Sequence, residues 1–410
     1  MDVIYFLDRR NKKMEYKFSK KLSELKPSAI REIFKSLSDP TIISFAAGNP
    51  SPESFPVEDL SRLSAEIFED QASFALQYGI TEGYTPLREA IAARQRSRFG
   101  ETMVRDTDTT LIVTGGQQGL ELACKAFCNE GDAVICENPS FIGALNAFRS
   151  NGVSTIGVEM EEDGISLEKL EETLKNTENA KLLYLIPTFQ NPSGTCMSLE
   201  KRMAVLALAK KYGIVILEDN PYGELRFAGE DIPTMKSLDN DGLVIYCSSF
   251  SKILSAGMRV GFVIAPSEIA SKMVVAKQVE DVHTNLFFQM LCHKYMTTCD
   301  LDAHITKIND LYRHKCNLML ECIDKYIPAD KVTFTRPEGG LFIWGTVKNC
   351  DDASFVVKKA IEKKVAVVPG TAFNCDTEAP SASFRLNYST PSDEQIVEGI
   401  KRLGEVFAEL

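Results

Sequence analysis

The fold is indicated first by residues 243–252, which have the sequence LVIYCSSFSK. The first four residues are apolar or aromatic types that favour a buried β-strand. Serines and Lys252 follow directly, so the lysine is expected at the end of a strand. Lysine in that position is usually solvated, and taken alone it indicates nothing more. Arg259 follows seven residues later, flanked like Lys252 by small residues, as is typical where backbone approaches a ligand closely.

Similar β-rich runs alternate with helical patterns through the middle of the chain. This alternation predicts an α/β domain with a mainly parallel seven-stranded sheet, helices on both faces and binding loops at the strand ends. The expected strands are Thr110–Val113, Ala133–Cys136, Thr155–Val158, Lys181–Ile186, Ile214–Leu217, Leu243–Tyr246 and Val260–Ile264. Helical patterns lie between them at Gly119–Cys128, Ser166–Leu174 and Leu199–Tyr212.

The pattern changes near residue 301. A long helical pattern over Leu301–Tyr326 precedes short β-rich runs and two further helices, which indicates a second, smaller α+β domain. The short runs are Val332–Thr335, Leu341–Thr346, Ala366–Val368 and Ser383–Tyr388. The residues before 57 are too few for a separate domain and are expected to pack against the small one. We therefore predict a large domain over residues 57–300 and a small domain built from residues 1–56 and 301–410.

Composition excludes several classes of protein. With 57 acidic and 46 basic residues the net charge is −11, which disfavours nonspecific binding to nucleic acid or to an anionic membrane. No apolar run is long enough to span a bilayer, and the N-terminus lacks the order of a secretory signal, so a cytoplasmic protein is expected. The 11 cysteines are scattered and form no C-x-x-C pair, which favours reduced thiols and no metal site.

Two further strand ends carry polar side chains. Asp219 follows the apolar run Ile214–Leu217 and precedes Tyr222, and Asn191 opens the sequence Asn-Pro-Ser-Gly. Asp219 could simply cap a turn, and Asn-Pro-Ser-Gly is first of all a turn signal. A carboxylate at this edge can instead pair with the protonated nitrogen of a pyridine cofactor, while Asn191 and Tyr222 donate to the ring oxygen.

Residues 113–119, VTGGQQG, indicate a strand, a glycine turn and the start of a helix. Backbone N–H groups at such a helix start form an anion site. The segment is neither a Walker loop nor a complete G-x-G-x-x-G motif, and a plain structural turn is equally consistent with it. Together with Lys252 and Arg259, these strand ends suit an aldehyde cofactor that bears a phosphate.

In this order, the segments Asn-Pro-x-Gly, Asp-x-x-Tyr and Ser-x-Ser-Lys-x6-Arg resemble the signature of the fold-type-I pyridoxal 5′-phosphate (PLP) aminotransferases of class I/II. The similarity is greatest to the subgroup containing α-aminoadipate (kynurenine) and aromatic aminotransferases, and it runs from about Lys26 to the end of the chain. The resemblance implies the PLP-dependent transferase fold. It also implies ping-pong transfer of an amino group from an L-amino acid to a 2-oxo acid such as 2-oxoglutarate.

The resemblance also assigns residues around the cofactor. Lys252 would hold PLP as a Schiff base and carry the proton between substrate Cα and cofactor C4′. Asp219 would pair with the ring nitrogen, and Asn191 and Tyr222 would bind the ring oxygen. Phe141 would stack on the ring, where many relatives have a tyrosine, so only stacking is implied. The phosphate would be held by Gly116, Gln117, Ser249, Ser251 and Arg259.

Further residues are assigned to the substrate and to a partner subunit. Arg385 resembles the arginine that binds the substrate α-carboxylate bidentately, although an arginine in a strand is otherwise more often a surface residue. Gly48 would border the substrate, and Phe342 would line the side-chain pocket. Tyr78 resembles the tyrosine that reaches the phosphate of a neighbouring subunit, which implies a homodimer with shared sites. Arg31 resembles an arginine that binds a distal carboxylate, and a solvated helix arginine is an equal alternative.

Other readings use the same residues. A PLP-dependent β-lyase or decarboxylase can share this fold, because a fold does not determine the reaction. A non-catalytic PLP-binding sensor is a second alternative, which the acidic charge and the few residues before the large domain disfavour.

Overall fold

The computed structural model describes residues 16–24 and 39–409 of the chain. Its largest sheet has the strand order β2-β9-β8-β7-β6-β3-β4-β5. The strands are β2 (Asp108–Val113), β3 (Ala133–Asn138), β4 (Ser154–Glu161), β5 (Gly164–Ile165), β6 (Ala180–Leu185), β7 (Val215–Asp219), β8 (Val244–Ser249) and β9 (Gly261–Pro266). The seven predicted strands are confirmed, with ends that differ by a few residues. The edge strand β5 was not predicted, because two residues form no recognisable pattern.

Strand direction explains how the loops gather at one edge. Neighbouring strands from β4 to β8 pair in parallel, whereas β9 pairs antiparallel with both β8 and β2. The first residue of β9, Gly261, therefore lies beside Ser249 and Val113, the last residues of β8 and β2. As a result, both ends of the loop between β8 and β9 lie at the carboxyl edge of the parallel strands.

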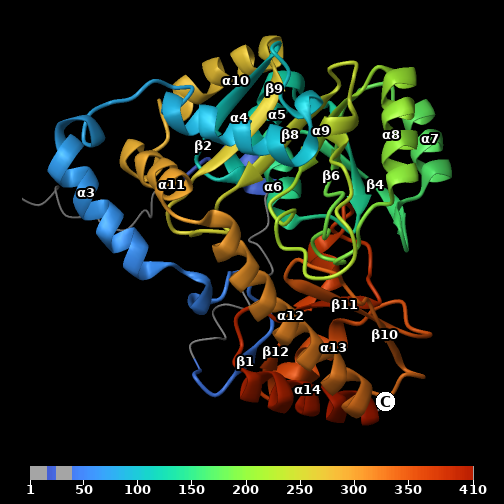
Figure 1. The fold of residues 1–410 in the computed structure, drawn as a ribbon. Helices are drawn as coiled ribbons and strands as arrows, with labels where there is room; N and C mark the ends of the chain where they lie inside the picture. The colour runs from blue at the N-terminus through green and yellow to red at the C-terminus, as the bar shows by residue number, and fades with distance from the viewer. Residues whose placement is uncertain (1–15, 25–38, 410) are drawn as a thin grey trace, which may run out of the picture.

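Helices cover both faces of this sheet (Figure 1). One face packs against α5 (Gly116–Phe127), α6 (Ile142–Ser150) and α10 (Ser267–Glu280), and the other against α4 (Thr85–Phe99), α7 (Leu167–Asn176), α8 (Leu199–Tyr212) and α9 (Met235–Leu238). Within β6, Leu182 and Tyr184 face the first set of helices, whereas Leu183 and Leu185 face the second. Because strand side chains alternate, a run of apolar residues is needed when both faces are covered.

The residues after 300 form a separate antiparallel sheet of order β10-β11-β14-β13 (Figure 1, orange to red). Its strands are β10 (Val332–Phe334), β11 (Phe342–Val347), β13 (Val368–Pro369) and β14 (Ser383–Asn387), and its helices are α12 (Leu301–Tyr326), α13 (Ser354–Glu362) and α14 (Asp393–Ala408). The predicted strand Ala366–Val368 is wrong as one element. The chain changes sheets at Val367, since β12 (Val365–Ala366) pairs with β1 (Ile43–Ser44) and β13 pairs with β14.

The pairing of β1 with β12 brings the N-terminal segment onto the C-terminal part of the chain. Between them in sequence lie α3 (Val57–Ala75) and α11 (Leu286–Thr298), which pack on each other.

The domain boundaries at residues 56/57 and 300/301 remain a prediction. Within residues 16–24 and 39–409, no helix is long and apolar enough to cross a membrane.

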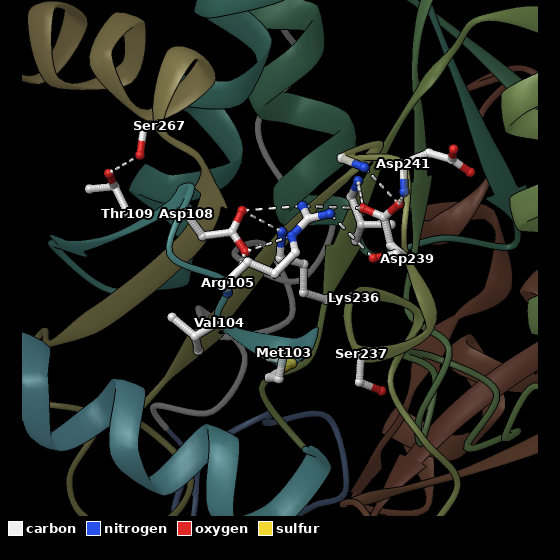
Figure 2. Close-up of polar contacts among 12 residues, drawn as sticks. Met103, Val104, Arg105, Asp108, Thr109, Lys236, Ser237, Asp239, Asp241 and Ser267 are labelled. Carbon is white, nitrogen blue, oxygen red and sulfur yellow. Dashed lines mark hydrogen bonds and ion pairs between the residues drawn. The ribbon is translucent and has the colours of Figure 1, made fainter. Parts of the chain in front are cut away.

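A buried ion-pair network lies at the opposite edge of the large sheet, where β2 begins (Figure 2). Lys236 Nζ lies 3.1 Å from Asp108 Oδ1, and neither side chain is exposed. Arg105 binds the same carboxylate at 3.3 Å, and its Nη1 donates to the carbonyl oxygen of Asp239. This network joins α9 to the start of β2. The candidate site lies at the other end of the strands, at the carboxyl edge.

Candidate active site

A cavity of about 350 Å³ opens at the carboxyl edge of the parallel strands. Its lining includes every predicted site residue except Tyr78 and Arg31. The predicted residues in the lining are Gly48, Gly116, Gln117, Phe141, Asn191, Asp219, Tyr222, Ser249, Ser251, Lys252, Arg259, Phe342 and Arg385. Residues from both sheets meet there, because Phe342 and Arg385 come from β11 and β14.

Lys252 presents its amine to the cavity just beyond the end of β8. Its Nζ donates a hydrogen bond to the carbonyl oxygen of Gly48 at 2.7 Å. Burial, reinforced by the positive charges of Arg385 and Arg259, lowers the pKa of the lysine to about 8. The amine is therefore closer to its neutral, nucleophilic form at physiological pH than an ordinary lysine.

Asp219 is buried at the end of β7. Burial raises the pKa of its carboxyl group to about 7, and a hydrogen bond from Tyr184 opposes that rise. Tyr184 Oη donates to Asp219 Oδ2 at 2.8 Å. Sequence analysis missed Tyr184, although a single hydroxyl within the apolar run of β6 was a usable signal, because buried tyrosine hydroxyls usually need a partner.

Arg385 is buried and bridges three parts of the chain. Its Nη1 donates to Asn191 Oδ1 and its Nη2 to the carbonyl oxygen of Ala46, each at 2.9 Å. The guanidinium carbon lies 4.1 Å from the ring centre of Phe342 and 5.0 Å from that of Phe373. Nε is buried without a hydrogen-bond partner among the described residues. Burial lowers the pKa of Arg385 to about 10, so the group stays cationic at neutral pH.

Asn191 and Tyr222 lie together on the same side of the cavity. Asn191 Nδ2 lies 3.4 Å from Tyr222 Oη, and the Tyr222 ring meets the ring of Phe342 edge-on. Burial raises the pKa of the Tyr222 hydroxyl above its usual value. Asn191 thus donates to the Tyr222 oxygen, and the Tyr222 hydroxyl keeps its own O–H as a donor. Sequence analysis did not identify Ala46 and Phe373, which contact Arg385 from distant parts of the chain.

At the other end of the cavity, the loop before α5 lies against Arg259. Gly115 has φ +72°, and a Cβ atom there would lie 2.1 Å from Arg259 Nη2. A Cβ at Gly261 would lie 2.8 Å and 2.9 Å from the backbone of Gly115 and Gly116. Glycine is therefore favoured at position 115 by its backbone conformation and required at position 261 by the close approach of backbone. Helix α5 starts at Gly116, so its first N–H groups lie at this end of the cavity.

Four other predicted residues line the cavity. Ser249 Oγ and Ser251 Oγ lie 2.7 Å apart. The side-chain amide of Gln117 is used elsewhere, because its Nε2 donates to the carbonyl oxygen of Gly143. At the helix start, Gln117 therefore contributes its backbone. Phe141 packs beside Gly143, where a Cβ atom would lie 2.4 Å from the phenylalanine ring.

Two predicted residues do not line the cavity. The Tyr78 side chain is 79% exposed in the single chain, and its ring contacts His283 edge-on. Arg31 lies outside the described residues, so its assignment stays a prediction.

The chain is similar to known proteins over nearly its whole length. The chain matches the family described as "Aminotransferase class I and II" over residues 40–403. It is 40% identical over 396 residues to aromatic-amino-acid aminotransferase 1 of Thermococcus litoralis, a match that covers 96% of this chain and 94% of that protein.

Two solved structures are similar over nearly their whole length. A kynurenine aminotransferase of Pyrococcus horikoshii in complex with PMP has a TM-score of 0.91 and 39% identity, covering 96% of this chain and 97% of that one. An alpha-aminoadipate aminotransferase of Thermus thermophilus, complexed with N-(5′-phosphopyridoxyl)-L-leucine, has a TM-score of 0.86 and 37% identity, with the same coverage. The chain therefore belongs to the class I and II aminotransferases.

Proposed function

We propose that the protein is a PLP-dependent aminotransferase that moves the amino group of an L-amino acid to a 2-oxo acid by a ping-pong mechanism, with 2-oxoglutarate as the acceptor. Family membership makes amino-group transfer its reaction, and one solved relative contains a phosphopyridoxyl amino acid. One observation carries the proposal. A single cavity combines a lysine of lowered pKa, a buried carboxylate and a buried guanidinium in Lys252, Asp219 and Arg385.

The cavity residues fit PLP at both ends. Among the described residues, the one side-chain hydrogen bond to Asp219 comes from Tyr184, which leaves its other oxygen available to a cationic ring N–H. At the opposite end, Gly115 and Gly261 keep side chains away from the start of α5, so backbone N–H groups can reach a phosphate. When bound, PLP supplies an aldehyde that bonds to amines and a pyridinium ring that withdraws electrons from Cα.

Each side chain then has a defined task. Lys252 would bond to the aldehyde and, once displaced by substrate, its amine would take the proton from substrate Cα. Asp219 would hold a proton on the ring nitrogen, and Asn191 and Tyr222 would donate to the ring oxygen. The phosphate would be bound by Arg259, by the two serine hydroxyls and by the first backbone N–H groups of α5.

A screen of amino donors against 2-oxoglutarate tests the proposal. Formation of glutamate together with the 2-oxo acid of the donor is the expected result. Release of pyruvate and ammonia from a cysteine conjugate, without glutamate formation, would instead indicate a β-lyase.

Arg385→Lys should raise KM for the amino donor by about 10²-fold, because lysine keeps the charge but cannot bind a carboxylate bidentately. The concentration of PLP that half-saturates the protein should change little, since Arg385 is not assigned to the cofactor phosphate. Steady-state kinetics at saturating PLP measure the first quantity, and absorbance titration measures the second. An unchanged donor KM would contradict the assignment.

Arg31→Ala should weaken the use of dicarboxylic donors such as 2-aminoadipate more than that of apolar donors, if Arg31 binds the distal carboxylate. The measurement is the ratio of kcat/KM for 2-aminoadipate to that for leucine, in the variant and in the wild-type protein. Equal losses with both donors would show that Arg31 does not contact the distal carboxylate.

A homodimer is also part of the proposal. The segment around Tyr78 exposes several large apolar side chains in the single chain, including Leu76 at 73%, Ile80 at 55% and Phe74 at 50%. Contiguous exposed apolar residues of this kind are typical of an interface. Sedimentation analysis should give twice the chain mass, and a fully active monomer would contradict the shared site.

A further inference from the structure

A buried lysine lies behind the loop that precedes α5, outside the cavity. Lys277, on α10, has no exposed surface. Its Nζ contacts Gln118 Oε1 at 2.7 Å, Asp281 Oδ1 at 2.8 Å and Thr284 Oγ1 at 3.0 Å. Each of these oxygens can accept a hydrogen bond, and an ammonium group has the three N–H donors needed to serve them all.

The partners of Lys277 hold the loop at Thr114. Gln118 Oε1 accepts a second hydrogen bond from the backbone N–H of Thr114 at 2.8 Å. Asp281 Oδ2 accepts the hydroxyl of Thr114 at 2.6 Å. The carbonyl oxygen of Thr114 accepts from Arg259 Nη2 at 3.3 Å. The residue before the glycine pair is therefore fixed through its N–H, its hydroxyl and its carbonyl group.

The loop needs support from other residues because its own glycines allow many backbone conformations. Gly115 and Gly116 lose more conformational entropy on ordering than other residues, and they have no side chains with which to anchor themselves. The direction of the first N–H groups of α5 depends on the preceding backbone. A polar scaffold on the far side of the loop can fix that direction before any anion arrives.

Lys277 also offsets a negative charge close to the expected anion site. Burial opposes ionisation of Asp281, but hydrogen bonds from Lys277 and Thr114 hold its pKa below the usual value. Without Lys277, the ionised Asp281 would still contact Thr114, two residues before the helix start, but it would lack the buried cation that pairs with it. Its charge would then repel a phosphate at that helix start.

We propose that Lys277 is a positioning residue for the cofactor phosphate, which orders the Thr114–Gly116 turn through Gln118 and Asp281 and neutralises the charge of Asp281. This role rests on the proposed function, because it presupposes a phosphate-bearing cofactor at the start of α5.

Lys277→Met tests the role in the full-length apoprotein, with Lys272→Met, an exposed lysine on the same helix, as the matched control. The half-saturating PLP concentration should rise about tenfold or more in the Lys277 variant and stay at the wild-type value in the control. The concentration of inorganic phosphate needed to raise Tm should increase in the same way. At saturating PLP, KM for the amino donor should change much less.

Thr114→Val provides a second variant that keeps Lys277 and its contact with Asp281. It removes the hydroxyl bonded to Asp281 but retains the Thr114 N–H, so a smaller rise of about threefold to tenfold in half-saturating PLP is expected. This variant decides the question if the Lys277 variant does not fold.

The failure of this role can be separated from the failure of the proposed function. Wild-type protein that takes up no PLP would overturn both. Wild-type affinity for PLP and for inorganic phosphate in folded Lys277→Met, or in Thr114→Val where the first variant is unfolded, would overturn the role of Lys277 alone. A general loss of stability with unchanged affinities has the same meaning, because a merely structural lysine would change Tm but not phosphate binding.

Discussion

Replacing Lys252 with alanine should reduce the rate of amino transfer by about 10³-fold or more, while the fold is retained. The variant lacks both the amine that bonds to the cofactor and the base that takes the Cα proton. Stability should change little, because among the described residues the Lys252 ammonium has one hydrogen bond, to the Gly48 carbonyl, and it is already disfavoured by burial. Turnover of an amino donor with 2-oxoglutarate, together with far-UV circular dichroism, measures both effects.

Lys175→Ala is a suitable control for this experiment. Lys175 lies on α7, remote from the cavity lining, and its side chain is exposed. The control should keep the wild-type rate. A wild-type rate in Lys252→Ala would remove the basis for the whole assignment.

Asp219→Asn should reduce the rate by about 10²-fold to 10³-fold. Asparagine keeps the size of the side chain and can still accept a hydrogen bond from Tyr184, but it cannot hold a proton on a ring nitrogen. The electron-withdrawing capacity of the ring would then fall, and the loss should appear in kcat at saturating PLP and donor.

Tyr184→Phe is the matched control for the carboxylate. It removes the hydrogen bond to Asp219 Oδ2 but keeps the negative charge, so a loss of less than about tenfold is expected. Equal losses in the two variants would mean that the reaction requires the hydrogen bond from Tyr184 as much as the charge of Asp219.

The same carboxyl group makes the stability of the ligand-free protein depend on pH. The pKa of Asp219 rises from an ordinary 3.8 to about 7 in the folded protein. Between these values the folded state binds more protons than the unfolded state, so the free energy of unfolding falls as pH rises from about 4 to 7. Asp219→Asn should reduce this slope and be more stable than the wild-type protein above pH 7. Urea unfolding of both apoproteins at pH 5 and pH 8 measures the difference.

The large sheet could be predicted from sequence because its strands are buried on both faces. Such strands appear as short apolar runs in the sequence. Lys252, just beyond β8, and Asp219, at the end of β7, can therefore be recognised as polar residues at strand ends. Helix α12 was predicted over Leu301–Tyr326, as observed, because its apolar pattern continues unbroken over its whole length. The two-residue strands β12 and β13 could not be told apart in sequence, since β12 pairs with the distant strand β1 and β13 pairs with β14. Strand β5 pairs locally with β4, but two residues are too short to form a recognisable pattern.

In the candidate site, too, local sequence patterns could be predicted and contacts between distant segments could not. Residues that lie on one motif were found together, whereas contacts between distant segments were not. Arg385 and Asn191 are 194 positions apart, and only the fold shows that they share a hydrogen bond. Lys277 was missed for a similar reason, because a lysine within a helical pattern is normally a surface residue and its burial depends on Gln118, Asp281 and Thr284.

The unpartnered Nε of Arg385 has a consequence for which molecules the cavity can accept. The two terminal nitrogens each use one N–H to donate to Asn191 and Ala46, so the guanidinium is held in a fixed orientation. Each of them keeps a second N–H, and Nε has no partner among the described residues. A molecule with an anionic oxygen beside Nε would accept the hydrogen bond that the guanidinium of Arg385 leaves unmade in the fold. Simple amines, amino acid amides and esters lack that anion, and they should be poor donors even where their side chains fit.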